Sequence, residues 1–265
     1  MHEDSPFASF PARFYLEKHY AQVDVENAAF MGAIARAVRP AGQLGTVVEL
    51  GGGPSLCGLL AMTAATTAGP RRVVWVDAAA SSLAEVRAWL SEDRSAFDYA
   101  AIEAWIEQTL GADPHAAAAR LRAAQWDLRQ ADLRNGLPDD LRGAGDVVGS
   151  YFLAEAAASD ETGFVELTQR IADAAAEQAT VVLGYIRHSR PYRLDGEALY
   201  PAFSVDEDAL PRLLDAAGLR FAELRVETGP MDDPPARPGY DGMVFASGRL
   251  AARGYSVSNA DGTNR

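Results

Sequence analysis

The stretch TVVELGGGPSLCGLL, residues Thr46–Leu60, is the one around which the rest of the chain is organised. Thr46–Leu50 is β-branched or apolar apart from Glu49, which predicts a buried β-strand. The glycines that follow allow a tight turn and a close approach of the backbone to a ligand. Pro54 suits the first turn of a helix, and the start of a helix presents free N–H groups. The stretch therefore predicts a strand, a glycine turn and a helix that together cradle a cofactor.

The spacing within this loop separates three kinds of cofactor site. A dinucleotide-binding turn has the pattern G-x-G-x-x-G, whose third glycine lets the helix pack closely on the strand. Gly51 and Gly53 fit this pattern, but Leu56 occupies the third position. A P-loop is excluded because no Lys-Ser/Thr pair follows the glycines. An acidic residue near the strand end, followed by GxGP, suits S-adenosylmethionine, which carries no phosphate. An ordinary glycine turn of an α/β protein is the alternative interpretation.

Length, composition and charge narrow the class of protein. The chain has 265 residues, 48% of them apolar, which is enough for one large α/β domain with a proper core. Its formal charge of −13 argues against a nucleic-acid-binding protein, which needs a basic face. A single cysteine, Cys57, excludes an internal disulfide, and the four histidines lack metal-ligand spacing. No signal peptide or membrane-spanning run is present in the sequence, so we predict a cytoplasmic protein that contacts neither nucleic acid nor membrane.

Two further predicted strands end in aspartates. The strand Arg72–Val76 is followed by Asp77, twenty-four positions after Gly53. In open α/β sheets an acid near this spacing hydrogen-bonds a cofactor ribose, and the alternative role is a helix N-cap. A third strand within Trp126–Leu133 is expected to end at Asp132. This aspartate either reaches an adenine amino group or is a solvated loop residue.

The remaining pattern alternates helices and strands. We expect helices over Val25–Val38 and Gly163–Gln178, and a third helix that Ser204 opens with Glu207 in a capping box. The remaining predicted strands are Gly145–Phe152, Thr180–Ile186, Phe221–Glu227 and Met243–Leu250, the last two forming an antiparallel hairpin at one edge. The prediction is a Rossmann-like α/β fold: a seven-stranded, mostly parallel sheet with one antiparallel edge strand and helices on both faces. Residues 14–250 form the single domain, with a lid and helix over 14–40, a flexible N-terminus over 1–13 and a disordered tail over 251–265.

Three motifs carry a resemblance to a known family. FYLEKHY at Phe14–Tyr20, ELGGGPS at Glu49–Ser55 and AFDY at Ala96–Tyr99 stand in the order of that family's motifs. They resemble the N-terminal tyrosine motif, the D-I-G-S-G-P-T motif and the A-F-D-W motif of the nicotinamide, phenylethanolamine and thioether methyltransferases. The resemblance covers roughly residues 14–250 and implies a class I methyltransferase that uses S-adenosylmethionine.

The resemblance also implies roles for individual residues at the cofactor. Tyr15 and Tyr20 would close over it, and Gly51, Gly53 and Ser55 would hold its amino-acid end. The other implied contacts are Asp77 with the ribose hydroxyls, Ser82 in place of the family's ribose-site asparagine, Asp132 and the backbone of Leu133 with the adenine, and Ser150 in place of a threonine at the fourth strand's end. Cys57 replaces a family tyrosine.

The acceptor side departs most from the family. Ser189 and Tyr192 match a serine and a tyrosine of the family's substrate pocket, whereas Tyr185 replaces an aspartate that faces nicotinamide, so nicotinamide is not the expected substrate. Glu155 and Asp241 lie near acids that hold the amine in the phenylethanolamine enzyme. Glu155 and Tyr192 are the expected catalytic residues, acting by positioning. We also expect Tyr151, Tyr185 and Tyr192 to line the pocket, where aromatic faces favour a cation.

Three functions follow from these predictions. The leading one is methyl transfer from S-adenosylmethionine to a small molecule, at an amine or a heteroaromatic nitrogen. A second keeps the cofactor but transfers its aminocarboxypropyl group, or cyclises that group to azetidine-2-carboxylate with release of methylthioadenosine. A third is an inactive protein that binds the cofactor or serves as a scaffold. Product analysis separates the first two, because methyl transfer leaves S-adenosylhomocysteine.

Overall fold

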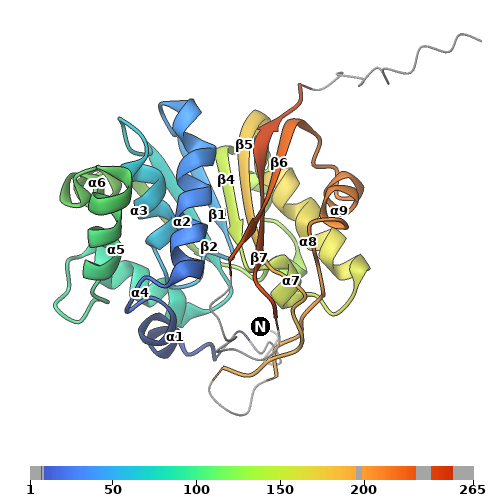
Figure 1. The fold of residues 1–265 in the computed structure, drawn as a ribbon, viewed down its shortest axis with the longest axis horizontal. Coiled ribbons are helices and arrows are strands. Elements are labelled where there is room, and N and C mark those ends of the chain that lie inside the picture. Colours follow the sequence, from blue (N-terminus) through green and yellow to red (C-terminus); the bar gives the residue numbers. More distant parts are fainter. Residues whose placement is uncertain (1–6, 8, 195–198, 231–239, 253–265) are drawn as a thin grey trace, which may run out of the picture.

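The computed structural model describes residues 7, 9–194, 199–230 and 240–252 of the chain. Of the predicted N-terminal and C-terminal stretches, residues 1–6, 8 and 253–265 lie outside these ranges. The strands form one seven-stranded sheet in the order β3-β2-β1-β4-β5-β7-β6 (Figure 1). The strands are β1 (Thr46–Leu50), β2 (Arg72–Asp77), β3 (Gln125–Gln130), β4 (Gly145–Tyr151), β5 (Ala175–Ile186), β6 (Phe221–Gly229) and β7 (Met243–Leu250).

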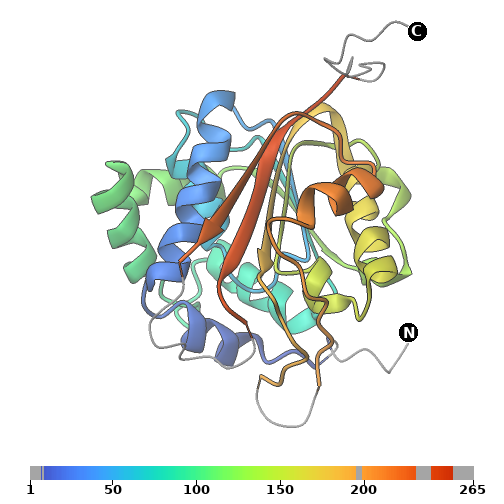
Figure 2. The same cartoon turned by 45° about the vertical axis from the view of Figure 1, so that its right-hand side comes forward.

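The pairing of the strands confirms the predicted sheet. β1 to β5 pair in parallel, and β7 runs antiparallel to both of its neighbours, β5 and β6. The long hairpin of β6 and β7 closes one side of the sheet (Figure 2). β1 pairs with β2 on one side and β4 on the other, so the strand order reverses at β1. In open α/β sheets ligands bind outside the carboxyl ends of the strands at such a reversal.

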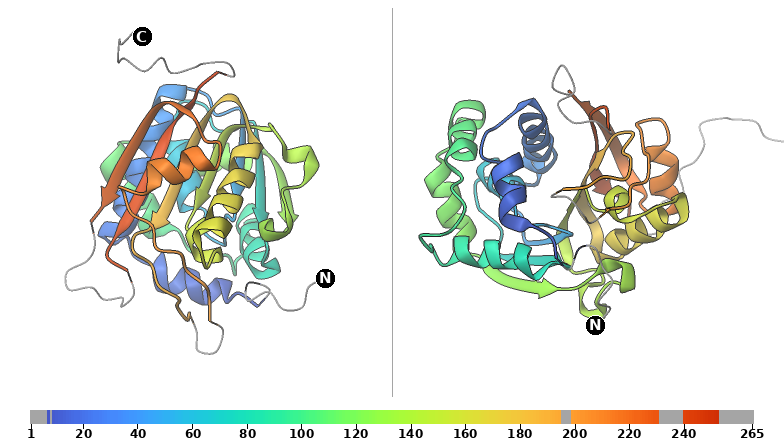
Figure 3. Two further views of the ribbon diagram at one scale, coloured as in Figure 1. Left: turned by 90° about the vertical axis from the view of Figure 1, so that its right-hand side faces the viewer. Right: turned by 90° about the horizontal axis from the view of Figure 1, so that it is seen from below.

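Helices cover both faces of the sheet, as the alternation of strands and helices predicts (Figure 3). One core lies between the sheet and the first group of helices, and a second core lies on the opposite face. The first group comprises α2 (Val25–Val38), α3 (Cys57–Ala64), α4 (Ala80–Leu90), α5 (Ala100–Trp105) and α6 (Pro114–Arg122), and the second comprises α7 (Ala154–Ala157), α8 (Glu161–Ala174) and α9 (Leu210–Ala216). The short helix α1 (Ala12–His19) packs on α4 near the carboxyl ends of the strands.

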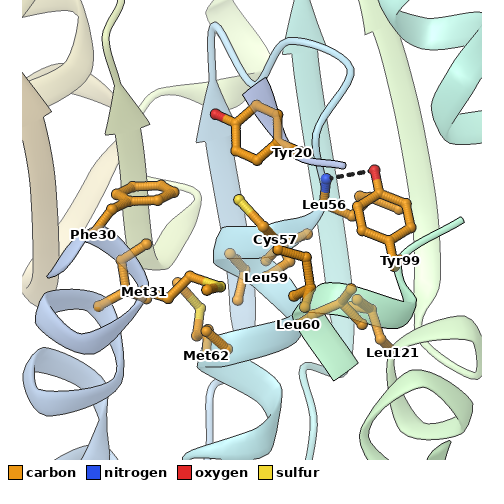
Figure 4. Packing of buried hydrophobic residues seen from close by; sticks show 14 of the residues in the cluster. Tyr20, Phe30, Met31, Leu56, Cys57, Leu59, Leu60, Met62, Tyr99 and Leu121 are labelled. Atoms are coloured by element: carbon orange, nitrogen blue, oxygen red, sulfur yellow. Dashed lines mark hydrogen bonds between the residues drawn. The ribbon is translucent and has the colours of Figure 1, made fainter. Parts of the chain in front are cut away.

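The helix after the glycine turn is buried on nearly all sides. Every residue of α3 from Cys57 to Thr63 is buried, because α2 and α6 pack against it. Tyr99, the last residue of the AFDY motif, is buried beneath the start of this helix (Figure 4). Its hydroxyl accepts a hydrogen bond from the Leu56 N–H at 3.0 Å, so the motif at 96–99 supports the cofactor loop rather than the sheet.

Two predicted boundaries in the second half of the chain are wrong. The helix expected over Gly163–Gln178 ends at Ala174, and β5 begins at Ala175. The helix expected to open at Ser204 begins at Leu210 instead. Glu207 makes no capping box because its carboxylate accepts two hydrogen bonds from the Arg187 guanidinium, at 2.7 and 3.0 Å. Glu207 thus forms a long-range ion pair with Arg187 and does not cap the helix.

Candidate cofactor and acceptor site

A cavity of about 730 Å³ lies at the carboxyl ends of the central strands. Its walls come from the glycine loop after β1, the ends of β2 and β4, helix α7, the stretch after β5 and the N-terminal segment that includes α1. Figure 3 shows α1 at the same end of the sheet as the stretch that follows β5. Asp77 ends β2, whereas Glu155 of α7 contacts Ile186 N at the end of β5, with β1 and β4 between these two strands. We call the side of the cavity with Asp77 the cofactor half and the side with Glu155 the acceptor half.

The glycine loop makes the tight turn that its sequence predicts, but the helix after it begins at Cys57 and not at Pro54. Gly51 adopts φ +66°, and a Cβ atom there would lie 2.7 Å from Leu153 Cδ1. A Cβ atom on Gly52 would collide with the indole of Trp75. Gly53 adopts φ +62°, and its carbonyl accepts a hydrogen bond from Trp75 Nε1 at 3.1 Å. These contacts and left-handed backbone conformations account for the run of glycines.

Asp77 ties the end of β2 to this loop. One carboxylate oxygen accepts a hydrogen bond from Gly53 N at 2.8 Å, and the other accepts from Ala79 N at 2.8 Å. Burial raises the pKa of Asp77, while these two bonds and the hydroxyl of Ser82 act to lower it. A carboxylate can accept about four hydrogen bonds, so capacity remains for a ligand in the cavity. The N-cap of α4 is Ala79 and has no side-chain cap hydrogen bond, so the N-cap alternative for Asp77 is wrong, whereas the ribose-binding role stays open to its carboxylate.

Asp132 lies beyond the end of β3 rather than at it. The strand ends at Gln130, and Asp132 caps a short 3₁₀ helix by accepting from Arg134 N at 2.9 Å. The Arg134 guanidinium also pairs with this carboxylate at 2.6 Å and lies over the ring of Phe7, 5.2 Å from its centroid. Asp132 and Leu133 both line the cavity, on the side that β2 and β3 provide.

Glu49 and Tyr151 place two polar groups against the floor of the cavity. Glu49 is 2% exposed, and burial raises its pKa well above the usual range. Burial likewise raises the pKa of Tyr151. Within the described part of the chain, neither Glu49 Oε2 nor the Tyr151 hydroxyl has a hydrogen-bond partner. Buried polar atoms without partners are costly, so both atoms mark a place where a polar ligand group fits.

Aromatic residues of the N-terminal segment cover the cofactor half. Tyr15 and Tyr20 both line the cavity, with ring centroids 5.8 Å apart. Tyr20 is buried, and burial raises the pKa of its hydroxyl. Ser55 of the glycine loop also lines the cavity. The residues that sequence assigned to the cofactor therefore meet around one space, except Ser150.

Glu155 is the buried carboxyl group of the acceptor half of the cavity. Its side chain is fully buried, and Oε1 accepts a hydrogen bond from Ile186 N at 2.9 Å. Its Oε2 has no hydrogen-bond partner among the described residues. Burial raises the pKa of Glu155 to about 8, so its carboxyl group is mainly neutral at pH 7. Such a shifted acid in a cavity is typical of a functional site.

Two other predicted acceptor residues also line this half. The Ser189 hydroxyl donates to the carbonyl of Phe203 at 3.1 Å, and the Tyr192 ring stacks on Tyr200. Burial raises the pKa of Tyr192 above its usual value, so it is a neutral phenol at physiological pH.

Three predicted site residues lie outside the cavity lining, which corrects their assignments. Tyr185 is 1% exposed and packs on Phe164 of α8, on the opposite face of the sheet. Ser150 is buried, and its hydroxyl donates to the carbonyl of Leu50 at 2.9 Å. Asp241 is half exposed and pairs with Arg187 at 2.9 Å and with His188 at 2.7 Å. All three hold structural contacts in place of ligand contacts.

Sequence reasoning missed several residues of the cavity wall. Glu49 enters the sequence prediction only as the acid before GxGP, and the structure alone shows its Oε2 to be buried and without a hydrogen-bond partner among the described residues. Glu26 on α2 is 3% exposed and accepts from the hydroxyl of Tyr240 at 2.9 Å. These two residues are 214 positions apart, so no local pattern predicts their contact.

Comparison with protein families finds one family whose model matches nearly the whole chain. The model of the NNMT/PNMT/TEMT family matches residues 1–248. The chain belongs to the NNMT/PNMT/TEMT family. A search of curated proteins finds no significant match. As a member of this family the protein is an S-adenosylmethionine-dependent methyltransferase.

Solved structures show the same fold at low sequence identity. One chain of the complex that contains the Haloferax volcanii Trm112 methyltransferase activator is 17% identical, with a TM-score of 0.61 over 95% of this chain and 100% of that one. DhpI in complex with S-adenosylhomocysteine is 15% identical, with a TM-score of 0.54 over 91% and 92%. The N-methyltransferase NodS from Bradyrhizobium japonicum WM9, also in complex with S-adenosylhomocysteine, is 10% identical, with a TM-score of 0.52 over 92% and 94%.

The cavity of this family member fits S-adenosylmethionine chemically. Glu49 Oε2, which has no hydrogen-bond partner among the described residues, suits the ammonium of the cofactor's amino-acid end. Asp77 offers carboxylate oxygens at the strand end where a ribose is expected. Burial raises the pKa of the Cys57 thiol to about 12, so this residue is no nucleophile at neutral pH. Within the described residues, no helix is both long and apolar enough to span a bilayer.

Proposed function

We propose that this methyltransferase acts on a nitrogen atom of a small molecule, an amine or a heteroaromatic base. The observation that carries the proposal is the buried Glu155, whose Oε2 is unpartnered among the described residues in the half of the cavity away from Asp77. A carboxyl group held there suits a basic nitrogen, because an ion pair or hydrogen bond with the acceptor would satisfy it.

When bound, the cofactor would supply a methyl group activated by a positively charged sulfur, for transfer to the acceptor nitrogen with S-adenosylhomocysteine as the other product. The chain's own residues supply binding and orientation. Gly51, Gly53 and Ser55 would hold the amino-acid end, Asp77 with Ser82 the ribose, and Asp132 with the Leu133 backbone the adenine. Tyr15 and Tyr20 would cover the cofactor and exclude water from it. Positioning of this kind supplies much of the rate in a displacement reaction.

Glu155 would act on the proton of the acceptor. An alkylammonium has a pKa near 10, and only the neutral amine has a lone pair for attack. Because burial raises the pKa of Glu155 to about 8, its carboxylate is a stronger base than an exposed glutamate and takes that proton more readily. Tyr192 and Tyr151 would orient the acceptor beside it, and Ser189 would help to fix the wall that carries Tyr192.

The test is formation of S-adenosylhomocysteine from S-adenosylmethionine with a panel of arylalkylamines and pyridines. We expect Glu155→Gln to lower kcat/KM for alkylamines by about 10²-fold, a typical contribution of a proton acceptor. The pH profile of the wild type should have an inflection near pH 8, and the variant should lose it and keep only the rise towards pH 10 that comes from the free amine. Glu166→Gln, an exposed change on α8, is the matched control. Equal activity of Glu155→Gln and wild type, or methylthioadenosine as the product, would overturn the proposal.

A further inference from the structure

The stretch that carries the acceptor-side residues is held by contacts outside the sheet. Residues 187–194 and 199–205 follow β5 and contain Ser189 and Tyr192. Tyr192 and Tyr200 form an isolated antiparallel bridge, with backbone hydrogen bonds of 3.1 and 2.9 Å. Their rings stack with centroids 5.3 Å apart and an interplanar angle of 19°. The position of Tyr192 at the cavity therefore depends on the position of Tyr200.

Tyr200 is in turn covered by the N-terminal segment. It is 1% exposed and does not line the cavity. The ring of Phe7 lies 5.4 Å from it and that of Phe10 lies 6.2 Å from it, the latter edge-on. Phe10 continues to Tyr15 at 5.2 Å, in the cover of the cofactor half. A continuous row of rings thus connects α1, the cofactor's cover, with residues 187–194 and 199–205, which we call the acceptor wall.

The N-terminal segment is fixed to the cofactor side of the molecule. Arg13 donates two hydrogen bonds to the Glu85 carboxylate of α4, at 3.0 and 2.6 Å, and one to the carbonyl of Ser95 at 2.6 Å. The hydroxyl of Ser81, at the start of α4, donates to the carbonyl of Phe10 at 2.7 Å. Helix α4 begins three residues after Asp77, so its start and the segment it anchors belong to the cofactor half.

We propose that Tyr200 is a positioning residue that couples the two halves of the cavity, so that a bound cofactor orders the acceptor wall through Phe10, Tyr200 and Tyr192. The inference rests on the acceptor half proposed above, but not on the identity of the acceptor. A cofactor that packs against Tyr15 and Tyr20 stabilises the N-terminal segment, and this segment covers Tyr200. The acceptor wall is therefore complete only when the cofactor's cover is in place.

Hydrogen exchange with S-adenosylhomocysteine alone tests this coupling without an acceptor. In the wild type we expect the ligand to slow amide exchange both in α1 and in residues 187–194 and 199–205. In Tyr200→Leu the protection of α1 should remain while protection of the acceptor wall is lost, and Tyr200→Phe should restore it. The Kd of S-adenosylhomocysteine should rise about threefold to tenfold in Tyr200→Leu, the value expected for losing one or two aromatic contacts.

Phe10→Leu provides a second variant that leaves the wall's own residues intact, in case Tyr200→Leu does not fold. It should separate the two protected regions in the same way. Ligand protection of the acceptor wall that persists in both leucine variants, or that is absent in the wild type while α1 is protected, would overturn the inference. If the wild type shows the coupled protection but methylates no amine, the proposed acceptor chemistry is wrong and the coupling stands. The two failures are therefore distinguishable.

Discussion

Replacing Glu155 by glutamine should make the protein more stable, and by an amount that grows with pH. The folded protein holds this carboxyl at a pKa of about 8, against an ordinary value of 4.5. Between these values the folded state binds a proton that the unfolded state releases. The proton-linked contribution of Glu155 is thus complete below 4.5 and is lost as the pH rises through 8. A glutamine side chain does not titrate, so it avoids this loss.

The magnitude follows from the displacement of the pKa. Each pKa unit corresponds to about 1.4 kcal/mol, and most of the interval between pH 5 and pH 7 lies inside the window. The free energy of unfolding of Glu155→Gln, relative to wild type, should therefore increase by about 2–3 kcal/mol over that interval. Stability of the variant is then gained where activity is lost, as expected for a functional acid in a buried site.

Urea unfolding of both proteins at pH 5, 6, 7 and 8, without ligand, measures this difference. Glu166→Gln on the exposed face of α8 serves as the control and should show no comparable trend. A difference between Glu155→Gln and wild type that stays constant across the series would show that the Glu155 pKa is not raised. In that case its role as a proton acceptor would lose its physical basis.

Two other variants or modifications test the cofactor loop. Gly51→Ala should lower stability by about 1–3 kcal/mol in thermal unfolding, because φ is +66° and the new Cβ would meet Leu153, whereas Gly111→Ala, at a similar φ with open space, should cost less. Cys57 should resist iodoacetamide at pH 7.5 in the native protein and react only after unfolding, because it is buried with a pKa of about 12. Rapid native labelling in a mass spectrum would contradict the buried thiol.

The part of the site that local sequence encodes could be predicted, and the part that depends on distant contacts could not. Gly51, Gly53 and Asp77 follow strands directly, so the strand pattern alone places them at one sheet edge. Asp132 is misplaced by two residues at the strand end, yet still lines the cavity. Residues that terminate strands are thus the most predictable part of such a site.

The orientation of Tyr185 follows from the period of its strand. Side chains alternate along a strand, so Tyr185 shares a face with Val181 and Leu183, whereas Gly184 and Ile186 share the other. The structure puts the former face against α8. Alignment by resemblance alone had assigned Tyr185 to the pocket, and the period of the strand shows the opposite.

Asp241 and Glu207 show the limit set by long-range ion pairs. Both carboxylates pair with Arg187, which lies 54 residues from the first and 20 from the second. Neither spacing has a local signature. The sequence therefore predicted an amine-binding acid at Asp241 and a capping box at Glu207, and not the ion pairs with Arg187. Charged residues that follow strand β5 compete for partners in ways that only the folded chain decides.

The central claim is that the cavity binds the cofactor with Asp77 at its ribose, and calorimetry with S-adenosylhomocysteine tests it most directly. We expect the wild type to bind and Asp77→Ala to lose at least about 30-fold in affinity, since it removes charge-assisted hydrogen bonds. Asp98→Ala is the matched control, because Asp98 accepts from the N–H two residues later, at 2.9 Å, as Asp77 does, but does not line the cavity. Wild-type-like binding by Asp98→Ala and weak binding by Asp77→Ala is the predicted result. No binding by the wild type, or equal affinity in Asp77→Ala, would contradict the claim.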